Sequence, residues 1–129
     1  MPQKQIEKIK LANGLVLDIW DCSRSIAPDT DKVELYVTTT IYLDHLFFSE
    51  PIHYETTRKH FGDNILFEYH NSRTFVPKSD SATIFQQFVD TFRQNVLPYL
   101  DTSDFPRHFV LSKYRDVLNN PFKYRQNNE

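Results

Sequence analysis

Hydrophobic and polar residues alternate along the first part of the chain, a pattern that predicts β-strands. Apolar side chains recur at every second position on both sides of Asn13-Gly14. A three-residue loop, Ala12-Asn13-Gly14, would pair Leu11 with Leu15 and Ile9 with Leu17, and would keep the apolar side chains on one face. A two-residue Asn-Gly turn would instead place a lysine beside Leu17. We therefore predict a hairpin with the longer loop and with Gly14 in the left-handed conformation.

The longest alternation runs from Lys32 to Leu43 and predicts one long strand with a buried face. Its second face carries hydroxyl groups, among them those of Tyr36, Thr38 and Thr40. Such a face is either a solvated sheet surface or the floor of a shallow site.

Short elements are predicted in the middle of the chain. Pro51 at the start and Gly62 at the end mark a helix from about Pro51 to Phe61. Asn64 to His70 reads as a further strand, Asn71-Ser72-Arg73 as a turn, and Thr74-Phe75-Val76 as a short extended piece.

Helical spacing dominates the remainder of the chain. One helix is predicted to start near Ser79, Asp80 or Ser81 and to end at Pro98, and a last helix to run from about Ser103 to about Leu118. The expected inward-facing residues of the two helices are Ile84, Phe85, Phe88, Val89, Phe92, Val96, Leu97, Phe109, Val110, Tyr114, Val117 and Leu118.

This order of elements predicts an α+β fold. We expect an antiparallel sheet of about four strands, formed by the N-terminal hairpin and the long third strand with one later strand, packed against a short helix and two C-terminal helices. At 129 residues the chain is expected to form one domain, 1–129, with residues 123–129 as a frayed tail.

Composition narrows the classes of function. Only two glycines occur, which argues against a glycine-rich phosphate loop, and one cysteine permits no internal disulfide. The net charge of −2 does not favour nucleic-acid binding, and the apolar runs are too short to cross a membrane. The N-terminus lacks the apolar segment of a signal peptide, so we expect a cytoplasmic protein.

Both ends of the chain carry a family resemblance. The run from Asn13 to Arg24, and the segments Leu97 to Leu100 and Phe105 to Leu111, resemble parts of a group of small uncharacterised bacterial proteins. The resemblance implies a bacterial cytosolic origin and brings no activity with it.

The polar stretch from Asp21 to Asp31 is the predicted ligand-binding loop. Its candidate residues are Asp21, Arg24, Asp29 and Asp31, beside Tyr36 of the following strand. Arg24 is the only basic residue between Lys10 and Lys32. It either forms an ion pair with Asp21, Asp29 or Asp31 that holds the loop, or it clamps an anion.

No motif assigns a reaction to these residues. Cys22 lies at a strand end without a fixed histidine partner, and the histidines lack the short spacings of metal ligands, so we predict no catalytic residue, metal or cofactor. The leading hypothesis is a small non-catalytic interaction or regulatory module that binds a protein partner or itself. The alternative is a small-molecule binder or enzyme with its site at the Asp21 to Asp31 loop.

Overall fold

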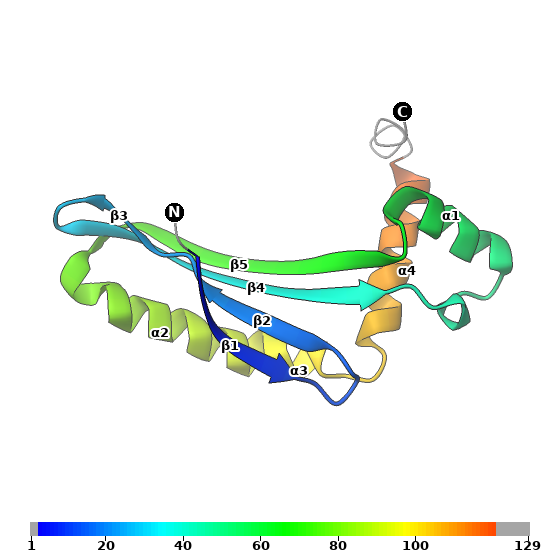
Figure 1. The fold of residues 1–129 in the computed structure, drawn as a ribbon, viewed down its shortest axis with the longest axis horizontal. Helices are drawn as coiled ribbons and strands as arrows, with labels where there is room; N and C mark the ends of the chain where they lie inside the picture. The colour runs from blue at the N-terminus through cyan, green and yellow to red at the C-terminus, as the bar shows by residue number, and fades with distance from the viewer. Residues whose placement is uncertain (1–2, 121–129) are drawn as a thin grey trace. The chain divides into compact units, whose positions relative to one another are not determined.

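The computed structural model describes residues 3–120 and confirms the α+β fold with an antiparallel sheet (Figure 1). The tail predicted over residues 123–129 lies outside the described residues. The strands are β1 (Lys4–Lys10), β2 (Val16–Asp21), β3 (Arg24–Ala27), β4 (Thr30–Tyr42) and β5 (Asn64–Pro77). The helical segments are η1 (His45–Phe47), α1 (Pro51–Phe61), η2 (Lys78–Asp80), α2 (Ser81–Thr91), the π-helical turn η3 (Phe92–Val96), α3 (Leu97–Leu100) and α4 (Phe105–Asn119).

The described chain divides into two compact units. The first comprises residues up to 39 together with 67–102, and the second comprises 40–66 together with the residues from 103 onward. The prediction of a single domain stays a prediction.

The N-terminal hairpin has the predicted register. Ile9 lies opposite Leu17, the Leu11 amide donates to the Leu15 carbonyl, and Gly14 has φ +93°. Asn13 does more than form the loop, because its side-chain amide donates to the carbonyls of Leu100 and Thr102, each at 2.8 Å. The hairpin loop is thereby fastened to the end of α3.

The prediction of a loop from Asp21 to Asp31 is wrong for the central part of this segment, because Arg24–Ala27 form strand β3. β3 continues β2 along the same edge of β4, because Asp21 lies opposite Leu35 and Arg24 opposite Lys32 in an unbroken register. Only Cys22 and Ser23 interrupt the ladder, and there the Ser23 hydroxyl accepts from the Glu34 amide at 3.0 Å. The Ser23 side chain thus accepts the hydrogen bond that a backbone carbonyl of a regular strand would accept. A polar segment such as this one can therefore still pair with β4.

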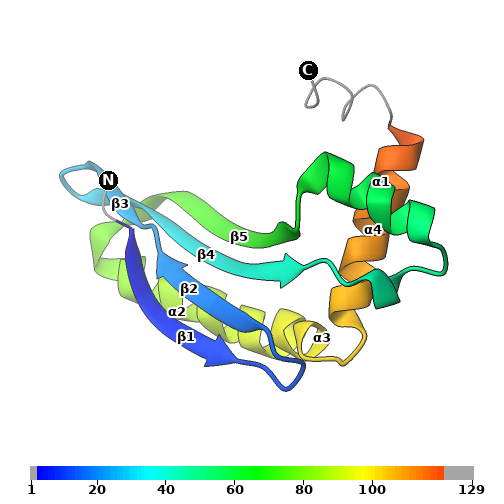
Figure 2. The ribbon, with the colours of Figure 1, turned by 45° about the vertical axis from the view of Figure 1, so that its right-hand side comes forward.

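The other edge of β4 pairs with β5, and both views place β4 between β2 and β5 (Figures 1 and 2). The predicted turn at Asn71-Ser72-Arg73 is wrong, since β5 runs without interruption through it to Pro77. Pairing with the long neighbour β4 outweighs the local preference of these polar residues for a turn.

One face of the sheet in the first unit packs on α2. The odd-numbered residues of β2 and β4 point to that face, and Leu17, Val33 and Leu35 are fully buried there. Tyr69 of β5 meets Phe92 with ring centroids 5.2 Å apart. The predicted inward face of this helical segment is confirmed, because Phe88, Val89 and Phe92 are buried.

The helical segment does not end at Pro98 as predicted. Proline has no amide hydrogen to donate to the preceding turn, and the chain widens into the π-helical turn just before α3 begins, with Pro98 in the first turn of α3. The helical path therefore continues to Leu100, which is fully buried.

The second unit is built on α1 and α4, which pack against each other. The Leu43 amide donates to the Asp63 carbonyl at 2.9 Å and closes the base of the connection that contains α1. Gly62 ends α1 with φ +82°, as predicted. On α4, Val110 and Val117 are buried as expected, whereas Leu118 is exposed and its predicted inward position is wrong.

Candidate functional site

The predicted site residues Asp29 and Asp31 fasten the start of α2 to the β3–β4 hairpin. The Asp31 carboxylate accepts from the Lys78 ammonium at 2.9 Å and from the Ser81 hydroxyl at 2.6 Å. These two hydrogen bonds lower the pKa of Asp31 below its usual value of 3.8. The Asp29 carbonyl accepts from the Lys78 amide at 2.9 Å. Both contacts are structural anchors between segments distant in sequence.

Asp21 and Arg24 lie at the break between β2 and β3. The Asp21 carboxylate accepts from the Ser23 amide at 2.9 Å, a local contact typical of turns. The Arg24 guanidinium lies 3.5 Å from the Glu34 carboxylate. The expected pairing of Arg24 with Asp21, Asp29 or Asp31 is therefore wrong in its partner, since the structure pairs Arg24 across the ladder with a β4 residue.

Glu34 is the centre of a set of side chains on the sheet face opposite α2, which we call the polar face. The Glu34 carboxylate lies 3.5 Å from Arg24, 3.8 Å from Lys32 and 3.5 Å from a ring nitrogen of His70 on β5. The polar face comprises Asp18, Trp20, Cys22, Arg24, Lys32, Glu34, Tyr36, Thr38, Glu68 and His70.

Tyr36 occupies the next position of the polar face along β4. Its ring stacks on the His70 ring with centroids 4.4 Å apart, and its hydroxyl donates to the Glu68 carboxylate. Burial, and then the hydrogen bond and charge of Glu68, raise the pKa of Tyr36 from 10.0 to about 12. The phenol is therefore neutral throughout the physiological pH range.

Cys22 lies opposite Glu34 on the same face, and its amide donates to the Glu34 carbonyl at 2.9 Å. Burial, followed by the negative charges of Glu34 and Asp21, raises the pKa of the thiol above 9.0. A nucleophilic cysteine needs the opposite shift, so this position disfavours the thiolate.

The polar face brings together Arg24 and Tyr36 from the predicted set and leaves Asp21, Asp29 and Asp31 outside it. The predicted set of site residues did not include Glu34, Glu68 or His70. Glu34 stands two residues before Tyr36, so strand alternation alone could have placed it beside Tyr36. The pairing of β4 with β5, which brings in His70, has no local signal. Carboxylates and cations on this face form ion pairs with one another, which favours a structural role for them.

β1 and β5 are both outer strands of the sheet, and they differ in how well their free edges are protected. β1 is short, carries lysines at positions 4, 8 and 10, and has a register shift between Gln5 and Glu7. These features disfavour edge-to-edge pairing with another chain. β5 has fourteen residues, and among the described residues no strand other than β4 pairs with it.

Phe75 stands out on β5. It is the only non-glycine residue in the described chain with positive φ, at +58°, and its side chain is 79% exposed. A bulky residue in the left-handed region is strained, and an exposed ring gains little from burial to offset that strain. Residues 72–75 are all exposed, so Phe75 ends a stretch of β5 that is open to solvent.

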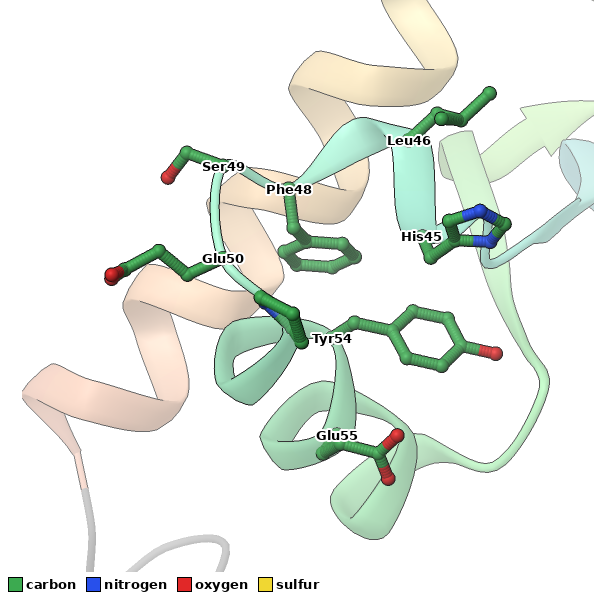
Figure 3. Close-up of a pocket in the computed structure, with 8 residues that line it drawn as sticks. His45, Leu46, Phe48, Ser49, Glu50, Tyr54 and Glu55 are labelled. Carbon is green, nitrogen blue, oxygen red and sulfur yellow. The ribbon is translucent and has the colours of Figure 1, made fainter.

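A shallow hollow of about 540 Å³ lies in the second unit, between η1 and α1. Figure 3 shows the rings of His45, Phe48 and Tyr54 gathered on one side, with Glu55 extending beside them and Glu50 pointing away. The Tyr54 ring lies 6.2 Å from that of His45 and 5.9 Å from that of Phe48, at interplanar angles of 86° and 74°. The Tyr54 ring therefore stands nearly perpendicular to the two other rings that line the hollow.

The residues that line this hollow were not among the site residues predicted from the sequence. The signal was the apolar run Leu46-Phe47-Phe48 in a connection where solvent-exposed residues are the norm. Leu46 is 76% exposed in the structure.

No helix among the described residues combines the length and the apolar character needed to span a membrane. Within the same residues, no three histidine, cysteine, aspartate or glutamate side chains are grouped as metal ligands would be. Comparisons with protein-family models, curated proteins and solved structures found no match to this chain. The resemblance to small bacterial proteins stays a prediction, and the function is argued from the geometry of the chain itself.

Proposed function

We propose that this protein is a non-catalytic interaction module that self-associates through the outer edge of β5. The observation that carries the proposal is Phe75, a strained and exposed aromatic residue on a long edge strand. Backbone strain persists where the structure enforces it, and it is concentrated at functional positions. An aromatic ring at the centre of an interface is a typical anchor of binding energy.

A second copy of the chain fits this edge by symmetry and by charge. Two β5 edges related by a two-fold axis pair antiparallel, and each copy presents the same surface to the other. β5 carries one glutamate and one arginine, so two copies meet without net charge repulsion when His70 is neutral. β1 carries three lysines against one glutamate and would repel its own copy.

The polar face supports a non-catalytic role. Glu34 is paired with cations, Tyr36 is held by Glu68, and the Cys22 thiol has a raised pKa. The single cysteine of the chain also supports a reducing compartment such as the cytoplasm. The alternative, a small-molecule site beside Arg24 and Tyr36, stays a prediction that a thermal-shift screen of metabolites would test.

Light scattering coupled to size-exclusion chromatography tests the proposal directly. We expect the mass of the wild-type chain to rise from 15.4 kDa toward twice that value as concentration increases. We expect Thr74→Lys to weaken the dimer about fivefold, because like charges would then face each other across the two-fold axis. Thr83→Lys adds the same charge at an exposed position of α2 and serves as the matched control.

Two results would overturn the proposal. One is a wild-type chain that stays monomeric up to about 0.5 mM, a concentration at which even a weak specific dimer forms. The other is a dimer that Thr74→Lys and Thr83→Lys leave equally stable, which would place the interface elsewhere on the molecule.

A further inference from the structure

The second unit contains a shallow hollow whose chemistry can be argued independently of the proposed self-association. We infer that the hollow between η1 and α1 binds the guanidinium group of an arginine side chain from a partner polypeptide. His45, Phe48, Tyr54 and Glu55 form this site, which we call the aromatic corner.

The geometry of the rings is the first argument. Tyr54 meets both His45 and Phe48 at steep angles, so the three rings do not form a closed stack and they line part of the hollow of about 540 Å³. Phe48 is held in place from behind, because its ring lies 6.1 Å from that of Tyr114 on α4 at 89°. The faces of aromatic rings attract cations, and arginine occupies such positions more often than lysine.

Charge is the second argument. Glu55 lies on α1 one residue after Tyr54, is exposed, and forms no hydrogen bond or ion pair with the described part of the chain. Glu50 is already 3.2 Å from the His53 ring and points away from the corner. An unpaired carboxylate next to ring faces matches a guanidinium, which can stack on a ring and donate two parallel hydrogen bonds to a carboxylate.

Arg58 of the same chain is a cation that would compete with an external guanidinium at the edge of the aromatic corner. The Arg58 guanidinium donates to the Tyr54 hydroxyl at 3.2 Å, one helical turn further along α1. Arg58 thereby binds the outer end of Tyr54, and its positive charge also attracts the Glu55 carboxylate without forming an ion pair with it. Removing its charge should therefore make the corner more attractive to an external guanidinium.

An NMR titration of the full chain with N-acetyl-arginine-methylamide tests this inference. We expect amide shifts centred on residues 45–55, and we expect the uncharged citrulline analogue to bind at least about fivefold more weakly, since it lacks only the charge. Glu55→Gln and Tyr54→Leu should each weaken binding by about threefold or more, and Arg58→Gln should strengthen it.

Asp90→Asn is the matched control for charge, because it removes an exposed helical carboxylate from the first unit. It should leave the affinity unchanged. Equal binding of the citrulline analogue would overturn the inference, and so would an equal loss in Glu55→Gln and Asp90→Asn, which would mean that only the overall charge of the protein matters. Glu55 is exposed, so its variant is expected to fold and the result remains interpretable.

Discussion

Tyr36 shows how one residue on the polar face links structure to pH. Its pKa is raised to about 12 by burial and by Glu68, so its proton is held more tightly in the folded chain than in the unfolded chain. A group of this kind contributes stability that is fully present below its unfolded pKa, near 10, and that is lost as the pH rises toward about 12.

We therefore predict that the free energy of unfolding falls between about pH 10 and pH 12 more steeply in the wild type than in Tyr36→Phe. Urea unfolding followed by the fluorescence of the single tryptophan, Trp20, measures both slopes. Glu68→Gln should lower the Tyr36 pKa only in part, because burial is the larger cause of the shift. Identical slopes in the wild type and Tyr36→Phe would contradict this account.

At the scale of the element, β5 combines a long free edge with Phe75, the one non-glycine residue of positive φ among residues 3–120. Phe75→Gly removes the steric cost of positive φ, about 1–2 kcal/mol for an L-residue, and adds about 0.5–1 kcal/mol of backbone entropy to the unfolded chain. The ring itself is largely exposed, so little burial is lost.

We predict that Phe75→Gly raises the free energy of unfolding of the monomer by about 0.5–1 kcal/mol and weakens self-association. Phe75→Ala is the control, since it removes the same ring but keeps the Cβ that causes the strain. Urea unfolding at low protein concentration and light scattering at high concentration separate the two effects. If glycine and alanine change stability equally, Phe75 stores no relievable strain.

The elements that sequence reasoning predicted are those whose signals are local. Gly14 in the loop, and the requirement that Ile9 and Leu17 lie on the same apolar face, determine the hairpin register. Apolar residues at helical spacing identify the buried face around Phe88. β3 and the middle of β5 were missed because pairing with β4 stabilises them, and their own composition favours turns. The partners of the candidate site residues were missed for the same reason. Arg24 pairs with Glu34 because β3 and β4 are neighbouring strands, and Asp31 pairs with Lys78, which lies 47 positions away in the sequence.

At the scale of the whole molecule, the two proposed surfaces share no residue and lie in different compact units. The β5 surface at residues 72–75 belongs to the first unit, and the aromatic corner belongs to the second. Substitutions at sites without shared partners have additive effects, to within about 0.5 kcal/mol. If each surface acts through its own contacts, the two binding activities should therefore be separable.

We predict that Thr74→Lys leaves the affinity for N-acetyl-arginine-methylamide within about twofold of the wild-type value, and that Glu55→Gln leaves the dimerisation constant equally unchanged. The double variant should show the sum of the two free-energy changes. NMR titration and light scattering on the four proteins complete this cycle. A coupling larger than about 1 kcal/mol would mean that arginine binding and self-association use one interface, with the corner of each copy filled by an arginine of the other.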